Sequence, residues 1–436
     1  MKNSFFLTTF FIILILSLVY LLNLDSLGAA LDNHWQFLDL PLLFKDPYGS
    51  LVSLHAQPPL LNFLAYLLHL IPGNLYTHFV VLNSILGGLV ALIIYKVIYT
   101  YTGSNKYSFF SALVFLLYPS TLIYAAYPFY PMPTALGYTI LAYSFSIAKS
   151  SHKQSLALLI FSTIYLSLLR SSFSQLHIIV FIVAYFVYVK GGEVVSAKKM
   201  FLVGLIAILP IAIISIKNYK LYHFYGVSSW QPINVANGVG IQFPDGAFPP
   251  PEIIVKKYPE IECISWHDQN LLLNKSNGYP NMNSCYVLGW AKKQKSELMD
   301  KYSLNGHISE VIKNSQIYFL ASDSYSFNTN RVKIYVYADV VNKIMAILPA
   351  NFGENTRTIY VLAIMMSLVI GVFNRKYLLS IFVLIVVIHF FTHVLVDGKE
   401  SQRFVFDIEP ILLMILTMLI YEFSQSLRGK LAKTNN

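Results

Sequence analysis

Long apolar segments follow one another through most of the chain, and they constrain its fold more than any other feature. The first runs from Phe5 to Leu24, about the 20 residues needed to cross the hydrocarbon core of a bilayer. It is too long for the apolar part of a signal peptide, so we expect an uncleaved first helix. Because backbone polar groups cannot stay unpaired in lipid, the segments should all be helices. Ten more lie at about 58–71, 77–99, 107–126, 131–148, 155–171, 173–189, 200–216, 358–373, 377–396 and 404–423.

The composition supports a membrane protein. Hydrophobic residues make up 56% of the 436 residues and charged residues only 12%, more apolar surface than a soluble chain can bury. The net charge of +10 does not indicate a nucleic-acid partner, because the basic residues lie in short connections between apolar segments or in the tail. We therefore expect an all-α polytopic membrane protein with about 10–11 hydrophobic segments.

Three regions follow along the chain. Residues 1–216 form an N-terminal transmembrane module whose first external loop spans 25–57, and residues 357–436 form C-terminal transmembrane helices with a cytoplasmic tail. Between them, 217–356 is rich in polar residues and contains three consecutive prolines and both cysteines. This region is expected to be an extracytoplasmic domain with an α/β or irregular fold.

The distribution of charge predicts the topology. Basic clusters at 149–153, 190–199, 374–376 and 428–433 belong inside, which puts the first loop and the large domain outside. Counting full spans between those two gives the wrong parity, so one segment must not cross. The segment 58–71 is the best candidate, because it has about 14 residues and a proline at both ends. The alternative is that 155–171 and 173–189 are irregular.

Cys263 and Cys285 both lie in the expected exterior domain, which favours a disulfide in an oxidising compartment. Two independent buried thiols are the alternative. Metal motifs such as CxxC or HExxH do not occur in the sequence, and neither does a glycine-rich phosphate loop.

Four polar segments adjoin the apolar segments on the expected exterior side, at 25–57, 170–175, 217–226 and 397–403. One carboxylate among several cations suits a lipid-linked sugar phosphate, because Arg and Lys bind phosphate and a carboxylate accepts a proton from an acceptor. Singly, each cation has a simpler explanation, which is anchoring at lipid headgroups. The candidate substrate-binding residues are His34, His55, Gln57, Arg170, Lys217, Asn218, Lys399, Glu400 and Arg403.

Three short motifs in these segments occur in a definite order. Asp32 precedes Pro58-Pro59-Leu60, Lys217-Asn218 precedes Phe224-Tyr225-Gly226, and Glu400-Ser401-Gln402-Arg403-Phe404 precedes Pro410. In this order they resemble the GT-C glycosyltransferases, in particular protein O-mannosyltransferases and the aminoarabinose transferases of bacterial lipid A. The resemblance covers residues 1–235 and 355–425.

The resemblance implies an inverting hexosyl or pentosyl transfer from a polyprenyl-phosphate donor to a glycan, lipid or protein acceptor, outside the cytoplasm at a bacterial plasma membrane. Asp32 would be the general base; its alternative role is a helix N-cap. The chain departs from the family at Asn33, where a second acid is common, and at Lys217, which replaces Arg. Since it has no Asp-x-Asp pair, we expect neither a metal nor another cofactor.

Two other functions fit a chain of this kind. A polymerase or ligase of surface polysaccharide should have arginine-rich external loops, whereas the large loop here holds only Arg331, with Arg357 directly after its end. A transporter or flippase of lipid-linked sugars should show internal repeats or charges near the middle of the membrane. The sequence shows no clear repeat, and its charges gather beside the apolar segments.

Overall fold

The computed structural model describes residues 2–21, 37–190, 196–238, 302–318, 352–396 and 404–434, together with Ser276, Asn283 and Asp300. All regular structure in these residues is helical and no strand occurs among them, which confirms the all-α class. The expected α/β domain is not supported. The described parts of 217–356 form the end of α11, α12 (Gln231–Gly238), α15 (Leu304–Tyr318) and the start of α18.

Apart from α2 and α3, which lie in the first loop, the remaining helices agree closely with the apolar segments, with 107–126 divided between α6 and α7. Their bounds are α1 (Lys2–Leu21), α2 (Leu40–Lys45), α3 (Pro47–Ser53), α4 (Leu60–His69), α5 (Leu75–Thr102), α6 (Asn105–Leu117), α7 (Pro119–Ala126), α8 (Pro131–Ser146), α9 (His152–Leu169), α10 (Gln175–Lys190), α11 (Ala197–Tyr222), α18 (Phe352–Phe373), α19 (Tyr377–Val396) and α20 (Glu409–Thr434).

Four described helices are long and apolar enough to cross a membrane: α5, α11, α19 and the Glu409–Arg428 part of α20. The pair α6 and α7, bent by 58° at its break, is a fifth candidate. Shorter apolar helices occur at Phe5–Leu21, Leu60–His69, Gln175–Val189 and Arg357–Phe373. The chain therefore has the character of a multi-pass membrane protein.

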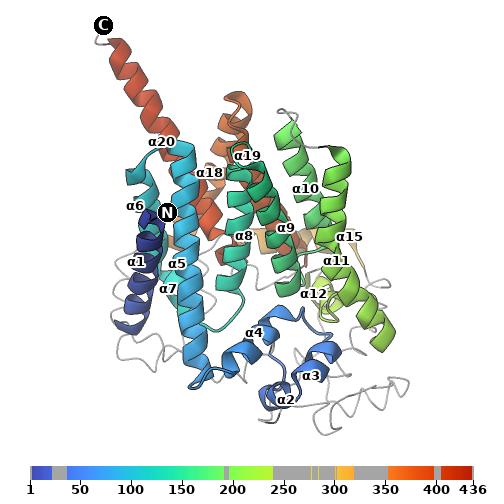
Figure 1. Cartoon of the computed structure of the whole chain (residues 1–436). Helices are drawn as coiled ribbons and strands as arrows, with labels where there is room; N and C mark the ends of the chain where they lie inside the picture. Colours follow the sequence, from blue (N-terminus) through green and yellow to red (C-terminus); the bar gives the residue numbers. More distant parts are fainter. Residues whose placement is uncertain are drawn as a thin grey trace.

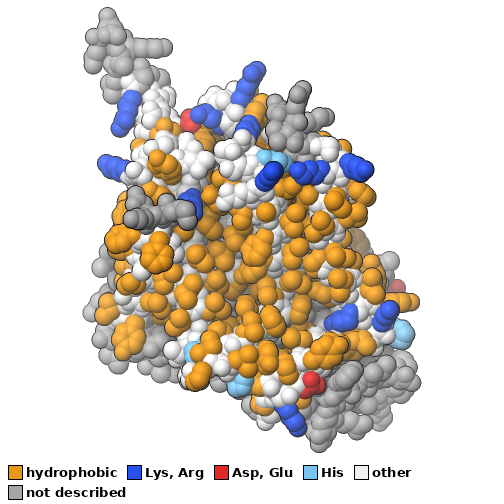
Figure 2. All heavy atoms as spheres, viewed as in Figure 1, with side chains coloured by type: hydrophobic (Ala, Val, Ile, Leu, Met, Phe, Trp, Pro, Cys, Tyr) orange, Lys and Arg blue, Asp and Glu red, His pale blue; other side chains and the backbone are white. Residues whose placement is uncertain are grey.

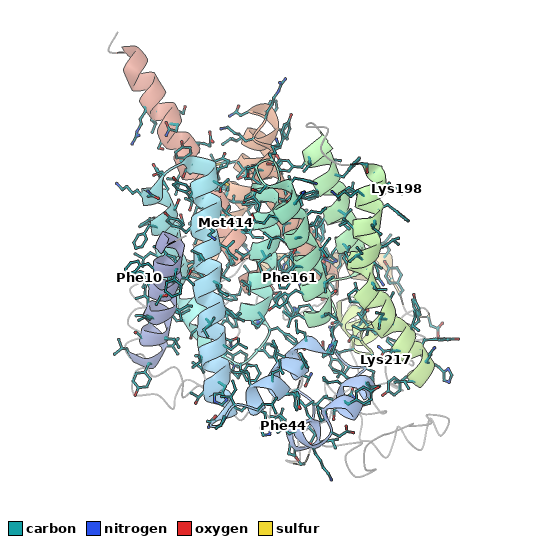
Figure 3. The ribbon with its side chains drawn as sticks, in the orientation of Figure 1. Phe10, Phe44, Phe161, Lys198, Lys217 and Met414 are labelled. Atoms are coloured by element: carbon teal, nitrogen blue, oxygen red, sulfur yellow. The ribbon has the colours of Figure 1, made fainter. Side chains whose placement is uncertain are left out.

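The long helices run side by side as a bundle, and α2, α3 and α4 lie across its lower end (Figure 1). Hydrophobic side chains cover the middle of the visible face, and Lys and Arg side chains gather mainly at the upper end (Figure 2). Lys198 and Lys217 occupy opposite ends of α11 (Figure 3). The connections α8–α9 and α18–α19 lie at the upper end, as do the last residues of α10 and the first residues of α11, so the described parts of the basic clusters at 149–153, 190–199 and 374–376 share one end of the bundle.

The segment around α4 does not cross the bundle. α4 has ten residues and is therefore about 15 Å long, half the thickness of the hydrocarbon core. α1 ends and α5 begins at the lower end, where α4 lies (Figure 1). This agrees with the expectation for 58–71. The alternative is wrong, because α9 and α10 are regular helices of 18 and 16 residues.

Prolines and aspartates organise the first loop. Asp39 caps α2 by accepting a hydrogen bond from Leu42 N at 3.0 Å, and Asp46 caps α3 by accepting one from Gly49 N at 2.9 Å. Each helix has a proline in its first turn, where the missing N–H is not needed. Asp39 is buried, with 3% of its surface exposed, whereas Asp46 is partly exposed.

Close packing of α1 against α5 depends on two glycines of α5. A Cβ added at Gly88 would lie 3.0 Å from the backbone N of Ile12 and 3.1 Å from its Cα. A Cβ at Gly87 would meet only side-chain atoms, the nearest being Ile15 Cδ1 at 2.7 Å. Small residues of this kind let the backbones of membrane helices approach each other closely.

Near the upper end of the bundle, Glu422 of α20 contacts both α5 and the turn between α18 and α19. Its Oε1 accepts a hydrogen bond from Tyr101 OH of α5 at 2.7 Å and pairs with Lys376 Nζ at 3.0 Å. Lys376 lies in the turn between α18 and α19. One carboxylate thus joins three parts of the bundle.

Candidate functional site

The first loop contacts the end of α11 through a set of hydrogen bonds, which we call the loop–α11 junction. It comprises Ser53–Ala56 of the loop with Lys217, Tyr222, Ser228 and Ser229. Lys217 Nζ donates to Leu54 O, and Tyr222 OH donates to Ser53 O at 2.6 Å. Ser228 Oγ donates to Ala56 O, and Ser229 N donates to His55 O at 2.9 Å. Segments more than 160 residues apart in sequence are joined here.

His55 lies at the centre of the junction. Its side chain is 1% exposed, and its Nδ1 is 2.7 Å from Ser229 Oγ. Its backbone N–H donates to Asn283 Oδ1 at 2.7 Å. Burial, and then the charge of Lys217, lower the pKa of His55 to about 3. The imidazole is therefore neutral near pH 7, with one nitrogen able to donate and the other to accept.

Lys217 and Asn218 have different surroundings. The half-buried Lys217 brings its ammonium to the first loop, near the lower end of α11 (Figure 3). Asn218 is fully buried, and its Nδ2 donates to Gly226 O at 2.8 Å. That bond closes the turn after α11, where His223 has a positive φ of 51°. Asn218 therefore shapes the chain, whereas Lys217 supplies a cation.

A second polar group lies inside the bundle, and we call it the histidine cluster: Arg170, His389, His393 and Asp407. Arg170 is the C-cap of α9, and its Nη2 is 3.7 Å from Asp407 Oδ2. The guanidinium also lies over the ring of Phe404, 4.6 Å from its centroid. Asp407, in the short 3₁₀ turn before α20, is 1% exposed.

The two histidines of this cluster lie one turn apart on α19, with ring centroids 4.3 Å apart. His389 Nε2 is 3.6 Å from Asp407 Oδ2, and its Nδ1 is hydrogen-bonded to the hydroxyl of Tyr318 on α15. The ring of His393 stacks on Phe404 at 4.2 Å. Burial, and then the charge of Asp407, raise the pKa of Tyr318 well above its usual range, so the hydroxyl stays protonated.

The structure separates the sequence-predicted residues into two groups. His55, Lys217 and Asn218 meet at or beside the loop–α11 junction, with the half-buried Gln57 two residues along. Arg170 belongs instead to the histidine cluster. The others lie outside the described residues: Asp32, His34, Lys399, Glu400 and Arg403, and the two cysteines of the expected disulfide, Cys263 and Cys285.

Of the histidine cluster, the sequence analysis found Arg170 and missed the other three residues. The signal for the two histidines was the His389-x-x-x-His393 spacing, which puts two imidazoles on one face of a helix. The spacing was hidden within an apolar segment and lacks the glutamate of an HExxH motif. Asp407 was hidden in the same way, because it falls inside the apolar segment 404–423.

The junction combines a neutral imidazole with a nearby cation. A neutral imidazole can hydrogen-bond a hydroxyl or relay its proton, and an ammonium attracts a phosphate oxygen. These properties suit an uncharged nucleophile and an anionic donor. No protein-family model, curated protein or solved structure matches the chain.

Proposed function

We propose that this chain is an integral-membrane glycosyltransferase that uses a polyprenyl-phosphate sugar as donor. The observation that carries the proposal is the loop–α11 junction, in which Lys217 donates to the backbone of the first loop beside His55. Two of the residues predicted to bind substrate thus meet at one end of the bundle. The same loop begins at the end of α1 and includes Asp32.

In the proposed reaction the acceptor hydroxyl or amine attacks the anomeric carbon of the donor sugar. The bond from that carbon to the phosphate oxygen breaks, and polyprenyl phosphate leaves with both bonding electrons. Asp32 accepts the proton of the acceptor, and a cation such as Lys217 binds the phosphate and offsets its growing charge. Inversion at the carbon follows from a single displacement.

Other residues enter the proposal in different ways. Lys399 and Arg403 are proposed as further phosphate ligands, and His34 and Glu400 as contacts to the sugar or acceptor. Arg170 is a weaker candidate for substrate binding, because it is 9% exposed and lies 3.7 Å from Asp407. The active site is proposed to face the exterior of a bacterial plasma membrane.

The test uses the purified full chain in lipid nanodiscs with a panel of radiolabelled polyprenyl-phosphate hexoses and pentoses. Membrane extract supplies the acceptors. The wild-type chain should release polyprenyl phosphate and label an acceptor with at least one donor. Asp32→Asn should lower the rate about 100-fold or more, the scale of lost general base catalysis.

Asp46→Asn is the matched control, because it makes the same change in the same loop. Asn keeps the capping hydrogen bond to Gly49 N, so this variant should transfer sugar like the wild type. Equal rates for Asp32→Asn and Asp46→Asn would remove Asp32 from the mechanism. Movement of labelled donor across vesicles without release of polyprenyl phosphate would instead indicate a flippase.

A further inference from the structure

The described residues hold a buried group of metal-binding side chains outside the loop–α11 junction. His389, His393 and Asp407 each offer one ligand atom, and these three atoms lie within 4.8 Å of one another. From this arrangement we propose that the chain binds a divalent transition metal between α19 and the turn before α20. The inference concerns binding alone and does not depend on glycosyl transfer.

The local structure already orients the three side chains as ligands. His389 and His393 are one turn apart on α19, so their rings project from the same face. Tyr318 OH is bonded to Nδ1 of His389, which leaves Nε2 on the side of Asp407, 3.6 Å from Oδ2. Metal-binding histidines commonly have such a partner on the second nitrogen.

Asp407 supplies the second, independent observation. Its side chain is 1% exposed, yet neither carboxylate oxygen accepts a hydrogen bond from a described residue. Arg170 Nη2 and His389 Nε2 lie 3.7 and 3.6 Å from Oδ2, too far for hydrogen bonds. A buried carboxylate is normally paired closely or bound to a metal.

The ligand set indicates the class of metal. Two imidazoles and one carboxylate suit Zn²⁺ or Fe²⁺, whereas Mg²⁺ and Ca²⁺ favour all-oxygen sites. Three protein ligands leave a coordination position for water or an anion. Oδ2 of Asp407 faces Arg170, which leaves Oδ1 for the metal.

Metal binding is measured on the full chain purified through a tag without histidines and stripped with a chelator. Zn²⁺ is titrated in competition with a coloured chelator, and metal content is determined by mass spectrometry. We expect one Zn²⁺ per chain. Zn²⁺ binding should become about 100-fold weaker or more in each of the ligand variants His389→Gln, His393→Gln and Asp407→Asn. This loss exceeds the one expected from removing a residue that only hydrogen-bonds to a ligand.

His177→Gln is the matched control, since it changes a buried histidine of α10 that contacts α19 at Thr392 but is not a ligand. It should bind Zn²⁺ like the wild type. Tyr318→Phe keeps the ring and removes the hydrogen bond to His389, so it should weaken binding about 10–100-fold.

A wild-type measurement covers the case in which ligand variants fail to fold. Co²⁺ added to the stripped wild-type chain should give the intense visible bands of a four- or five-coordinate ion, and Zn²⁺ should abolish them. A Co²⁺ spectrum identical to that of the free ion would overturn the proposal. Equal Zn²⁺ affinity in the wild type and the three folded ligand variants would do the same.

Discussion

The contact between α1 and α5 allows a sharp test, because two adjacent glycines differ only in what an added methyl group would meet. At Gly88 the new Cβ would lie 2.5 Å from Ile12 Cγ1, 3.0 Å from Ile12 N and 3.1 Å from Ile12 Cα. Backbone atoms cannot rotate away, so Gly88→Ala must push the two helices apart by a few tenths of an ångström. At Gly87 the closest atom is the terminal methyl of Ile15, 2.7 Å away, which can rotate.

The expected magnitudes follow from two opposing effects. Replacing glycine by alanine within a helix favours folding by about 0.5–1 kcal/mol. Overpacking against a fixed backbone costs about 1–3 kcal/mol. Gly88→Ala should therefore lower the free energy of unfolding by about 1–2 kcal/mol, whereas Gly87→Ala should change it by less than about 0.5 kcal/mol in either direction.

The assay is thermal unfolding of both variants in the same detergent. Gly88→Ala should unfold about 1–2 °C below the wild type, and Gly87→Ala within about 0.5 °C of it. Because α1 leads directly into the loop that includes Asp32, Gly88→Ala should also slow transfer. Equal melting temperatures for the two variants would contradict this prediction, because the backbone of Ile12 would then yield as easily as the side chain of Ile15.

Two further predictions concern the loop–α11 junction. The pKa of His55 is about 3 in the folded chain and 6.5 in the unfolded chain, so between these values only the unfolded chain binds a proton there. The stability contributed by neutral His55 is present above about pH 6.5 and is lost as the pH falls toward 3. In a plot of melting temperature against pH, His55→Gln should therefore flatten the curve over this range. Parallel curves for the wild type and the variant would contradict this prediction. Lys217→Met removes the hydrogen bond to Leu54 O and should lower the free energy of unfolding, measured with a chemical denaturant, by about 1–3 kcal/mol. The matched change at the exposed Lys220, Lys220→Met, should lower it by less than about 0.5 kcal/mol. Equal losses in the two variants would show that the Lys217 hydrogen bond adds no stability.

The sequence predicted the helices well, because length and hydropathy determine them in a membrane protein. The segment expected at 77–99 is Leu75–Thr102, and the one at 377–396 is Tyr377–Val396. The segment 107–126 breaks at Tyr118, because Pro119 has no N–H and favours the first turn of a new helix. By contrast, α11 continues through Pro210. Whether a proline breaks or bends a helix depends on packing that the sequence does not show.

The candidate sites were less predictable. The junction residues His55 and Lys217 were found because they lie at the edges of apolar segments, where charge is conspicuous. His389 and Asp407 lie within such segments, and their proximity depends on how α15, α19 and α20 pack. A one-dimensional pattern contains no information on that packing, so a buried polar group is easily read as an interruption of an apolar run.

Polar contacts near both ends of α20 limit how this helix can move. Near its start, Asp407 faces Arg170 of α9 and His389 of α19, and near its far end Glu422 joins Tyr101 of α5 and Lys376. Sliding α20 along its axis by one turn, about 5.4 Å, would break both sets of contacts at once. We therefore expect α20 to move with α5 and α19 as one rigid body. In the proposed reaction, substrate would then enter without sliding of α20 past these two helices.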